Sequence, residues 1–241
     1  CDADTAREAL DVVVRRTDQP FAVRVSARCP LEPGDLPAQA TKVVLADHDL
    51  LPRWQPAAAD RRLVVEVRSA DDARIALAAG ADGLVAKGAE SGGRVGVTGA
   101  LVLCQQIRAL TDAPLWVQGG IGRHTAGAAL VGGATGVVVD SQVALLREMS
   151  LPRPIRLAIA AMDGSETRVL ADHRVFTRPD LWVADPELHP TPEEIAARLG
   201  ASSLTEDAVP VGKDAALASA FATRYGTVGA MVAGLRTERD A

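Results

Sequence analysis

The chain has 241 residues, enough for one large domain or two small ones, and 48% of them are hydrophobic, enough for a sizeable core. The net charge is −5 with acidic and basic residues interspersed, which argues against a nucleic-acid-binding face. No apolar run approaches the roughly 20 residues of a membrane span, and no signal-peptide pattern opens the chain. We therefore expect a cytoplasmic protein with neither nucleic acid nor membrane as a partner.

The cysteines and histidines do not predict a disulfide framework or a metal site. Cys1, Cys29 and Cys104 are odd in number and widely separated, which is typical of reduced thiols. No two histidines share a ligand spacing, so no metal is expected. The chain begins at Cys1 and enters a helical pattern almost at once, so we expect it to be a fragment of a longer protein.

The first third of the chain alternates between predicted helices and strands. Residues 5–16 have an amphipathic helical pattern, and residues 21–25 and 42–46 read as strands. The turn Thr-Asp-Gln-Pro at residues 17–20 recurs as Thr-Asp-Ala-Pro at residues 111–114. This recurrence indicates that one helix-to-strand junction is used twice.

The middle of the chain predicts buried strands joined by short helices. Residues 63–67 and 83–86 are apolar strands, and the helix between them begins at Ser69 and ends before Gly80. Strands without polar alternation are typical of a parallel sheet that is buried on both faces.

A second strand–helix–strand unit spans residues 115–140. It comprises a strand at 115–117, the pair Gly119-Gly120, a helix at 125–131 and a strand at 136–139. Bare glycine amides at a helix N-terminus can approach a phosphate. The alternative is that the two glycines only make a tight turn.

The two units repeat one another. Ala-Gly-Ala-Asp-Gly-Leu-Val at residues 79–85 is followed 53 residues later by Gly-Gly-Ala-Thr-Gly-Val-Val at 132–138. A repeated βα unit favours a (β/α)8 TIM-type barrel, although a doubly wound sheet would also repeat. In such barrels the site is built from loops at the carboxyl ends of the strands.

The composition changes after residue 150. Residues 151–208 are rich in Pro, Asp and Arg and are expected to form an insertion, with a hairpin at 168–176 and a helix at 191–200. Residues 209–213 read as a loop, and 214–235 as a helical stretch interrupted near Gly226 and Gly229. We therefore assign residues 1–150 to the barrel core, 151–208 to the insertion and 209–241 to closing helices of the same barrel.

Two motifs carry a family resemblance. Gly-Leu-Val-Ala-Lys-Gly-Ala-Glu-Ser-Gly-Gly-Arg at residues 83–94, with Gly-Gly-Ile at 119–121, resembles the nitronate monooxygenase (2-nitropropane dioxygenase) family of FMN barrels. The spacing of the second motif is most similar to the FMN-type enoyl reductases of polyketide and polyunsaturated fatty acid synthases. The resemblance covers residues 5–147, resumes weakly at 211–213, and includes no counterpart of the family's first strand. We therefore expect that strand to lie upstream of Cys1 in the parent protein.

The resemblance implies an FMN bound through its phosphate, with NAD(P)H as a candidate electron donor. Gly119 and Gly120 would contribute backbone amides, and Ser91 would lie close to the isoalloxazine. The residues expected at the cofactor are Lys87, Ser91, Gly92, Gly93, Gln118, Gly119, Gly120, Asp140, Ser141 and Gly212; those expected to act in catalysis are Arg94 and His124.

Two residues depart from the family pattern. Arg94 stands where the family usually has histidine, and a guanidinium has no proton-accepting atom, so Arg94 cannot act as a general base. It could instead bind a carboxylate, a thioester oxygen or a phosphate, or pair with Glu90. Asp140 stands where the family has glycine, and its carboxylate would repel a phosphate unless it turns to Arg123 or Lys213. His124, at a helix start, could be a hydrogen-bond donor or weak base, or simply face solvent.

Two functions from different classes follow. The leading one is an FMN-dependent oxidoreductase domain, of enoyl reductase or nitronate monooxygenase type, that acts on carrier-bound acyl chains in a multidomain synthase. The alternative is a degenerate barrel that serves as a structural or docking module of such a synthase. Acyl carrier protein or other synthase domains would be the partners, and a homodimer is also considered. A third option is a barrel that binds another phosphorylated ligand.

Overall fold

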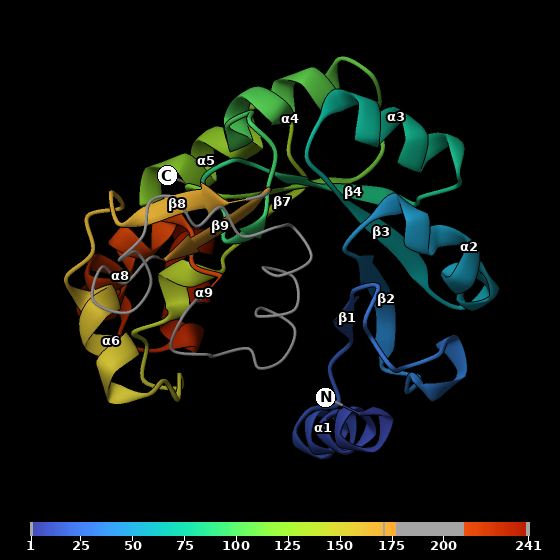
Figure 1. Ribbon diagram of the computed structural model, residues 1–241, viewed down its shortest axis with the longest axis horizontal. Coiled ribbons are helices and arrows are strands. Elements are labelled where there is room, and N and C mark those ends of the chain that lie inside the picture. The colour runs from blue at the N-terminus through green and yellow to red at the C-terminus, as the bar shows by residue number, and fades with distance from the viewer. Residues whose placement is uncertain (1, 171, 177–209, 240–241) are drawn as a thin grey trace.

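The computed structural model describes residues 2–170, 172–176 and 210–239. Its main sheet is an arc of six parallel strands in chain order (Figure 1). The strands are β1 (Phe21–Val25), β2 (Ala40–Leu45), β3 (Arg62–Val67), β4 (Gly83–Lys87), β6 (Leu115–Gln118) and β7 (Gly136–Val138). A closed TIM-type barrel has eight strands, so the described residues form an open part of a barrel. The predicted fold class is confirmed.

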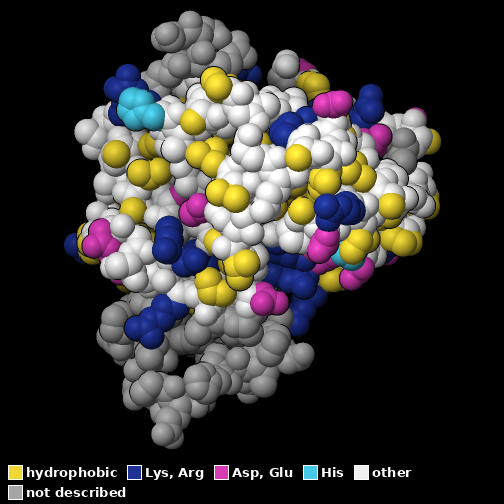
Figure 2. Space-filling view, turned by 90° about the horizontal axis from the view of Figure 1, so that it is seen from above, with side chains coloured by type: hydrophobic (Ala, Val, Ile, Leu, Met, Phe, Trp, Pro, Cys, Tyr) yellow, Lys and Arg dark blue, Asp and Glu magenta, His cyan; other side chains and the backbone are white. Residues whose placement is uncertain are grey.

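Helices cover the outer side of the arc and extend it at both ends (Figure 1). The helices of the arc are α1 (Ala3–Arg16), α2 (Leu51–Trp54), α3 (Ala70–Ala78), α4 (Ala100–Arg108) and α5 (Arg123–Val131). Those that follow it are α6 (Arg153–Ala160), α8 (Ala218–Tyr225) and α9 (Val228–Arg239), and α9 packs against α5. On the face seen in Figure 2, basic, acidic and apolar side chains are interspersed. No described helix is long and apolar enough to cross a membrane.

The central strands are apolar because both of their faces are largely buried. Helices cover the outer face, and the inner face lines the concave side of the arc. All five residues of β4 are buried, as are five of the six of β3. Leu45, Leu63, Leu84 and Leu115 come from four neighbouring strands and are 0% exposed. Fully burying each such side chain stabilises the fold by about 1.5–3 kcal/mol.

The repeat predicted from the sequence has a structural basis. Gly80 and Gly133 end α3 and α5 with φ values of +91° and +93°, which glycine adopts without strain. Two residues after each glycine, a side-chain oxygen accepts a hydrogen bond from the first strand of the unit. Leu63 N–H donates to Asp82 Oδ2 at 2.8 Å, and Leu115 N–H donates to Thr135 Oγ1 at 3.0 Å. Asp and Thr therefore accept the same backbone hydrogen bond at equivalent positions.

The repeated helix-to-strand turn also has matching hydrogen bonds. Gln19 N–H donates to Thr17 Oγ1 at 3.0 Å, and Ala113 N–H donates to Thr111 Oγ1 at 3.1 Å. A threonine hydroxyl that bonds the backbone two residues on stabilises a local turn. The recurrence of this tetrapeptide is thus a recurrence of local geometry.

A second sheet joins the loop after β4 to residues 167–176. It is antiparallel and has the order β5 (Gly93–Arg94), β9 (His173–Phe176), β8 (Thr167–Leu170), which confirms the predicted hairpin. The predicted interruption at Gly226 is confirmed by its φ of +69° between α8 and α9. The interruption predicted at Gly229 is wrong, because this residue lies inside α9. The predicted helix at 191–200 lies outside the described residues.

Candidate functional site

A cavity of about 430 Å³ lies on the concave side of the arc, toward the carboxyl ends of the strands. Strands β1, β2, β3, β4, β6 and β7 each contribute to its wall. The lining residues are Ala22, Arg24, Val44, Glu66, Val85, Lys87, Gly92, Gly93, Arg94, Gln118, Val138, Val139, Asp140 and Pro210. Six of the residues expected at the site, including Lys87, Arg94 and Asp140, therefore share one cavity.

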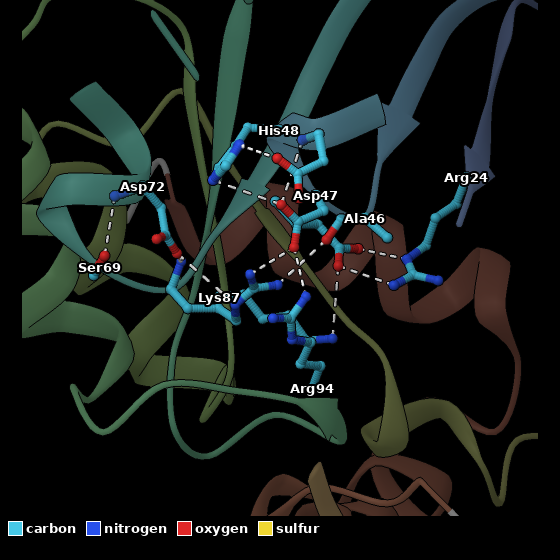
Figure 3. A network of polar contacts seen from close by, with 11 residues as sticks. Arg24, Ala46, Asp47, His48, Ser69, Asp72, Lys87 and Arg94 are labelled. Carbon is cyan, nitrogen blue, oxygen red and sulfur yellow. Dashed lines mark hydrogen bonds and ion pairs between the residues drawn. The ribbon is translucent and has the colours of Figure 1, made fainter. Parts of the chain in front are cut away.

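Glu66 is the centre of the charged groups in this cavity, and the family resemblance did not point to it. It is 4% exposed and accepts two hydrogen bonds from the Arg24 guanidinium, at Oε1 from Nε and at Oε2 from Nη2 (Figure 3). Lys87 Nζ lies 3.7 Å from Glu66 Oε2. Burial alone would raise the pKa of Glu66, but the hydrogen bond from Arg24 and the charge of Lys87 lower it overall. Glu66 is therefore held as a carboxylate.

Arg94 pairs with Asp47 rather than with Glu90. Arg94 Nη1 donates to Asp47 Oδ2 at 2.6 Å, and Arg68 Nη2 donates to the same oxygen at 2.8 Å (Figure 3). The considered pairing with Glu90 is wrong, because Glu90 Oε2 accepts a hydrogen bond from Ala100 N–H at the start of α4. Glu90 thus supplies the cap that Gly99, the residue before α4, cannot.

His48 lies beside Asp47 and Asp49, with its Nδ1 3.0 Å from Asp49 Oδ1. One ligand atom each from Asp47, His48 and Asp49 lies within 4.8 Å of the others. Two guanidinium groups already pair with Asp47. A metal ion would have to displace them, so we assign no metal to this cluster.

The Gly119-Gly120 turn does not face the cavity as an open set of amides. Both residues have positive φ, +110° and +63°. A Cβ added to Gly119 would lie 2.7 Å from Ser91 Oγ, and one added to Gly120 would meet the Glu90 side chain at 3.7 Å. The loop at residues 90–91 therefore covers this turn. Close packing together with positive φ accounts for Gly119, and positive φ alone accounts for Gly120.

Asp214 occupies the hollow beside this turn, and sequence reasoning missed it. Its side chain is buried, and its Oδ2 accepts a hydrogen bond from Gly120 N–H at 3.3 Å. Among the described residues its Oδ1 has no hydrogen-bond partner. Burial raises the pKa of Asp214 to about 7, the charge of Asp140 adds to the shift, and the Gly120 N–H opposes it.

Residues 212–213 hydrogen-bond to the turn after β7 and to the loop after β4, and so occupy the space beside both. Gly212 N–H donates to Ser141 Oγ at 3.0 Å, and Lys213 N–H donates to Glu90 O at 2.8 Å. A Cβ at Gly212 would overlap the Asp214 carboxylate. The structure therefore brings Ser141 and Gly212 together as expected, but bonded to each other beneath the segment that carries Asp214.

Asp140 turns to a neighbour that was not anticipated. Its Oδ2 accepts a hydrogen bond from Gln118 Nε2 at 3.1 Å, so the considered pairing with Arg123 or Lys213 is wrong. Burial raises its pKa, and the charge of Lys87 opposes this shift. Asp140 and Asp214 thus place two carboxyl groups where the resemblance implied a phosphate.

His124 lies apart from Arg94. It is exposed at the start of α5 and lines a separate cavity with Gly122, Leu217 and Phe221. The two cavities share no lining residue. The two residues predicted to act in catalysis are therefore not brought together. Ser91 is buried, and within the described part of the chain its hydroxyl has no hydrogen-bond partner.

Comparisons with known proteins agree with this fold. The nitronate monooxygenase family matches residues 54–170. FabK from Thermotoga maritima superposes with a TM-score of 0.81 at 21% identity, over 100% of this chain and 82% of that one. A nitroalkane oxidase from Streptomyces ansochromogenes gives 0.67 at 20% identity, over 97% and 85% of the two chains.

A domain from a biosynthetic cluster is also similar. The enoyl reductase domain of MlnA, from the macrolactin cluster of Bacillus amyloliquefaciens, gives a TM-score of 0.67 at 10% identity, over 100% of this chain and 85% of that one. A search of curated proteins finds no match. Residues 54–170 therefore match the nitronate monooxygenase family, and the fold of the chain is similar to that of FabK and of the nitroalkane oxidase.

Proposed function

We propose that this chain is a non-flavin barrel that has kept the oxidoreductase fold of its family and serves as a structural or docking module of a multidomain synthase. Proteins of this family are in general FMN-dependent. The proposal therefore depends on whether the residues present can hold the FMN phosphate.

The observation that carries the proposal is the Asp214 carboxyl group, which occupies the Gly120 amide. A phosphate placed there would meet Asp214 and Asp140, and Gly119 is covered by Ser91. With its pKa raised to about 7, Asp214 is partly ionised near neutral pH, and in its ionised form like charges at about 4 Å cost roughly 4 kcal/mol near a protein surface. One good hydrogen bond to a charged group returns only about 1.5–3 kcal/mol. The site does not fit the phosphate.

Arg94 adds a second argument against the family's chemistry. It lines the cavity where the family usually has histidine, and its guanidinium pairs with Asp47. Arginine cannot accept a proton. Abstraction of a proton beside a nitro group therefore has no base at this position.

The synthase context is supported by sequence and by one structural relative. The segments Met-Asp-Gly-Ser-Glu-Thr at 162–167 and Pro-Val-Gly-Lys-Asp-Ala at 210–215 resemble parts of large polyketide synthases. The MlnA domain comes from a macrolactin biosynthesis cluster. Other synthase domains or an acyl carrier protein are the partners that we propose.

Titration with FMN and with riboflavin tests the loss of the phosphate site, because the two ligands differ only in the phosphate. We expect the chain to show no saturable flavin binding that prefers FMN. The double variant Asp140→Gly/Asp214→Ser should gain such a preference, because it removes both carboxyl groups. Tighter binding of FMN than of riboflavin by the unaltered chain would overturn the proposal.

An FMN-dependent oxidoreductase remains the second candidate, favoured by the family match and by the cavity beside Gly92 and Gly93. It would reduce carrier-bound enoyl chains with NAD(P)H. If the titration shows FMN binding, NAD(P)H oxidation that depends on an enoyl thioester decides between the two functions. In the intact synthase, Arg94→Ala leaves the reduction state of the product unchanged under the first function and changes it under the second.

A further inference from the structure

Lys87 is the one lysine that lines the cavity. It ends β4, its side chain is 5% exposed, and its Nζ lies 3.7 Å from Glu66 Oε2. Figure 3 shows it among the charged side chains of this network. The chain's other two lysines, Lys42 and Lys213, are exposed. Lysines at the carboxyl ends of barrel strands face the region where barrels place their chemistry. Lys87 is therefore distinguished from the other two by position.

The surroundings of Lys87 suit a reactive amine. Burial lowers its pKa, although the charge of Glu66 opposes this effect. The Nζ–Oε2 distance of 3.7 Å to Glu66 is too long for a hydrogen bond but short enough for proton transfer after a small movement. Arg24, Arg68 and Asp140 are the other charged groups that act on the amine. A desolvated lysine loses its proton more readily and becomes a nucleophile.

Two guanidinium groups in the same cavity can bind an anion. Arg24 bonds Glu66 through Nε and Nη2, and Arg94 bonds Asp47 through Nη1. Among contacts within the described residues, Arg24 Nη1 and Arg94 Nη2 make no hydrogen bond. The side chains of Arg24 and Arg94 are 53% and 49% exposed, so a small carboxylate can reach them.

We propose that Lys87 forms an imine with a small aldehyde or ketone that carries a carboxylate, which Arg24 and Arg94 hold. Glu66 takes one proton from the Lys87 ammonium, and the Nζ lone pair attacks the carbonyl carbon. The carbonyl oxygen leaves as water with two of the hydrogens that began on nitrogen. The product is a protonated imine plus one water, with no change in oxidation state. This inference needs no flavin and does not rest on the docking role.

Reductive trapping tests the inference in the unaltered chain. The chain is incubated near neutral pH with cyanoborohydride and either glyoxylate, which carries a carboxylate, or acetaldehyde, which does not. Peptide mapping then reads the mass gain at each lysine. Lys42 and Lys213 are internal controls in the same folded protein, so the result does not depend on whether a Lys87 variant folds.

We expect glyoxylate to label Lys87 first and each exposed lysine at roughly a tenth of that level or less. The reason is that only the unprotonated amine reacts, and an exposed lysine is almost fully protonated near neutral pH. The ratio of Lys87 to Lys42 labelling should be higher with glyoxylate than with acetaldehyde. Arg94→Met should lower only the glyoxylate ratio. Labelling of Lys87 no faster than of Lys42, or equal ratios for the two aldehydes, overturns the inference. The flavin titration is a separate measurement. A negative trapping result would therefore overturn the imine proposal without affecting the proposal that the chain binds no flavin.

Discussion

At the scale of single residues, the carboxyl group that occupies the proposed phosphate position comes from a distant part of the sequence. Asp214 follows Gly120 by more than 90 positions, yet its carboxylate accepts the N–H that a phosphate would need. A carboxyl group buried beside Asp140 is costly when ionised, which is why its pKa rises to about 7. The same group therefore links the site to the stability of the fold.

Asp214→Asn should remove part of the pH dependence of unfolding. The folded chain holds the Asp214 proton up to about pH 7, whereas the unfolded chain releases it near pH 4, so the stability of the unaltered chain falls as pH rises between these values. The full shift corresponds to roughly 4 kcal/mol. Asparagine cannot ionise and still accepts from Gly120.

Denaturant unfolding of both proteins from pH 4 to pH 8 measures the effect. The stability of the variant relative to the unaltered chain should increase over this range and level off above pH 7. A difference that does not change with pH would show that Asp214 ionises normally.

At the scale of elements, the loop after β4 is held against the segment before α8. A Cβ at Gly92 would overlap the backbone carbonyl of Pro210, and Lys213 N–H donates to Glu90 O at 2.8 Å. One wall of the cavity is therefore made by two segments that must approach backbone to backbone. Only glycine allows this approach.

Gly92→Ala should destabilise the chain by about 1–3 kcal/mol, because backbone rather than a flexible side chain has to move. Gly127→Ala is the matched control. Gly127 lies inside α5, and a Cβ added there would have nothing within 4 Å, so alanine should stabilise by about 0.5–1 kcal/mol. Thermal unfolding compares the two, and equal melting temperatures would show that the Pro210 contact is not tight.

At the scale of the whole molecule, the C-terminal helices attach to the open arc through a small apolar cluster. Met231 of α9 is 1% exposed and packs with Phe221 and Leu146. Phe221 and Tyr225 stack edge to face with centroids 5.5 Å apart. This cluster joins α8 and α9 to the segment that follows β7.

Met231→Ala should therefore cost about 2–5 kcal/mol and loosen α8 and α9 together. Hydrogen exchange should show faster exchange in both helices, with little change in β3 and β4. Val232→Ala, one position along and 39% exposed, is the control and should change stability by no more than about 0.5 kcal/mol. Uniform loss of protection across the sheet would mean that the helices do not unfold as a separate unit.

The arc was predictable from the sequence because local signals agree there. Buried apolar runs mark β3, β4 and β6, and Ser69 accepts the Asp72 N–H as expected of a helix cap. α4 and α6 were not predicted. The start of α4 is capped by Glu90, ten residues earlier, which no local pattern reveals.

The site was harder to predict than the fold. Glycine motifs located the cavity, since the family spacing places residues 87–94 at one strand end. They did not reveal which groups satisfy the amides, because Asp214 reaches Gly120 only through the tertiary fold. In sequence, Asp214 is one acidic residue after Gly212 and Lys213, without a distinguishing pattern.

The pairing of β5 with β9 has a consequence for how the molecule is made. Arg94 cannot pair in its strand until His173 has been synthesised, and the backbone of Gly92 can approach that of Pro210 only when Pro210 has left the ribosome. During translation the six-stranded arc can assemble before either event, with its concave face still exposed to water. The cavity is therefore completed only after the arc, and long sequence separations of this kind slow that step. A nascent chain halted before residue 173 would carry the sheet without the site.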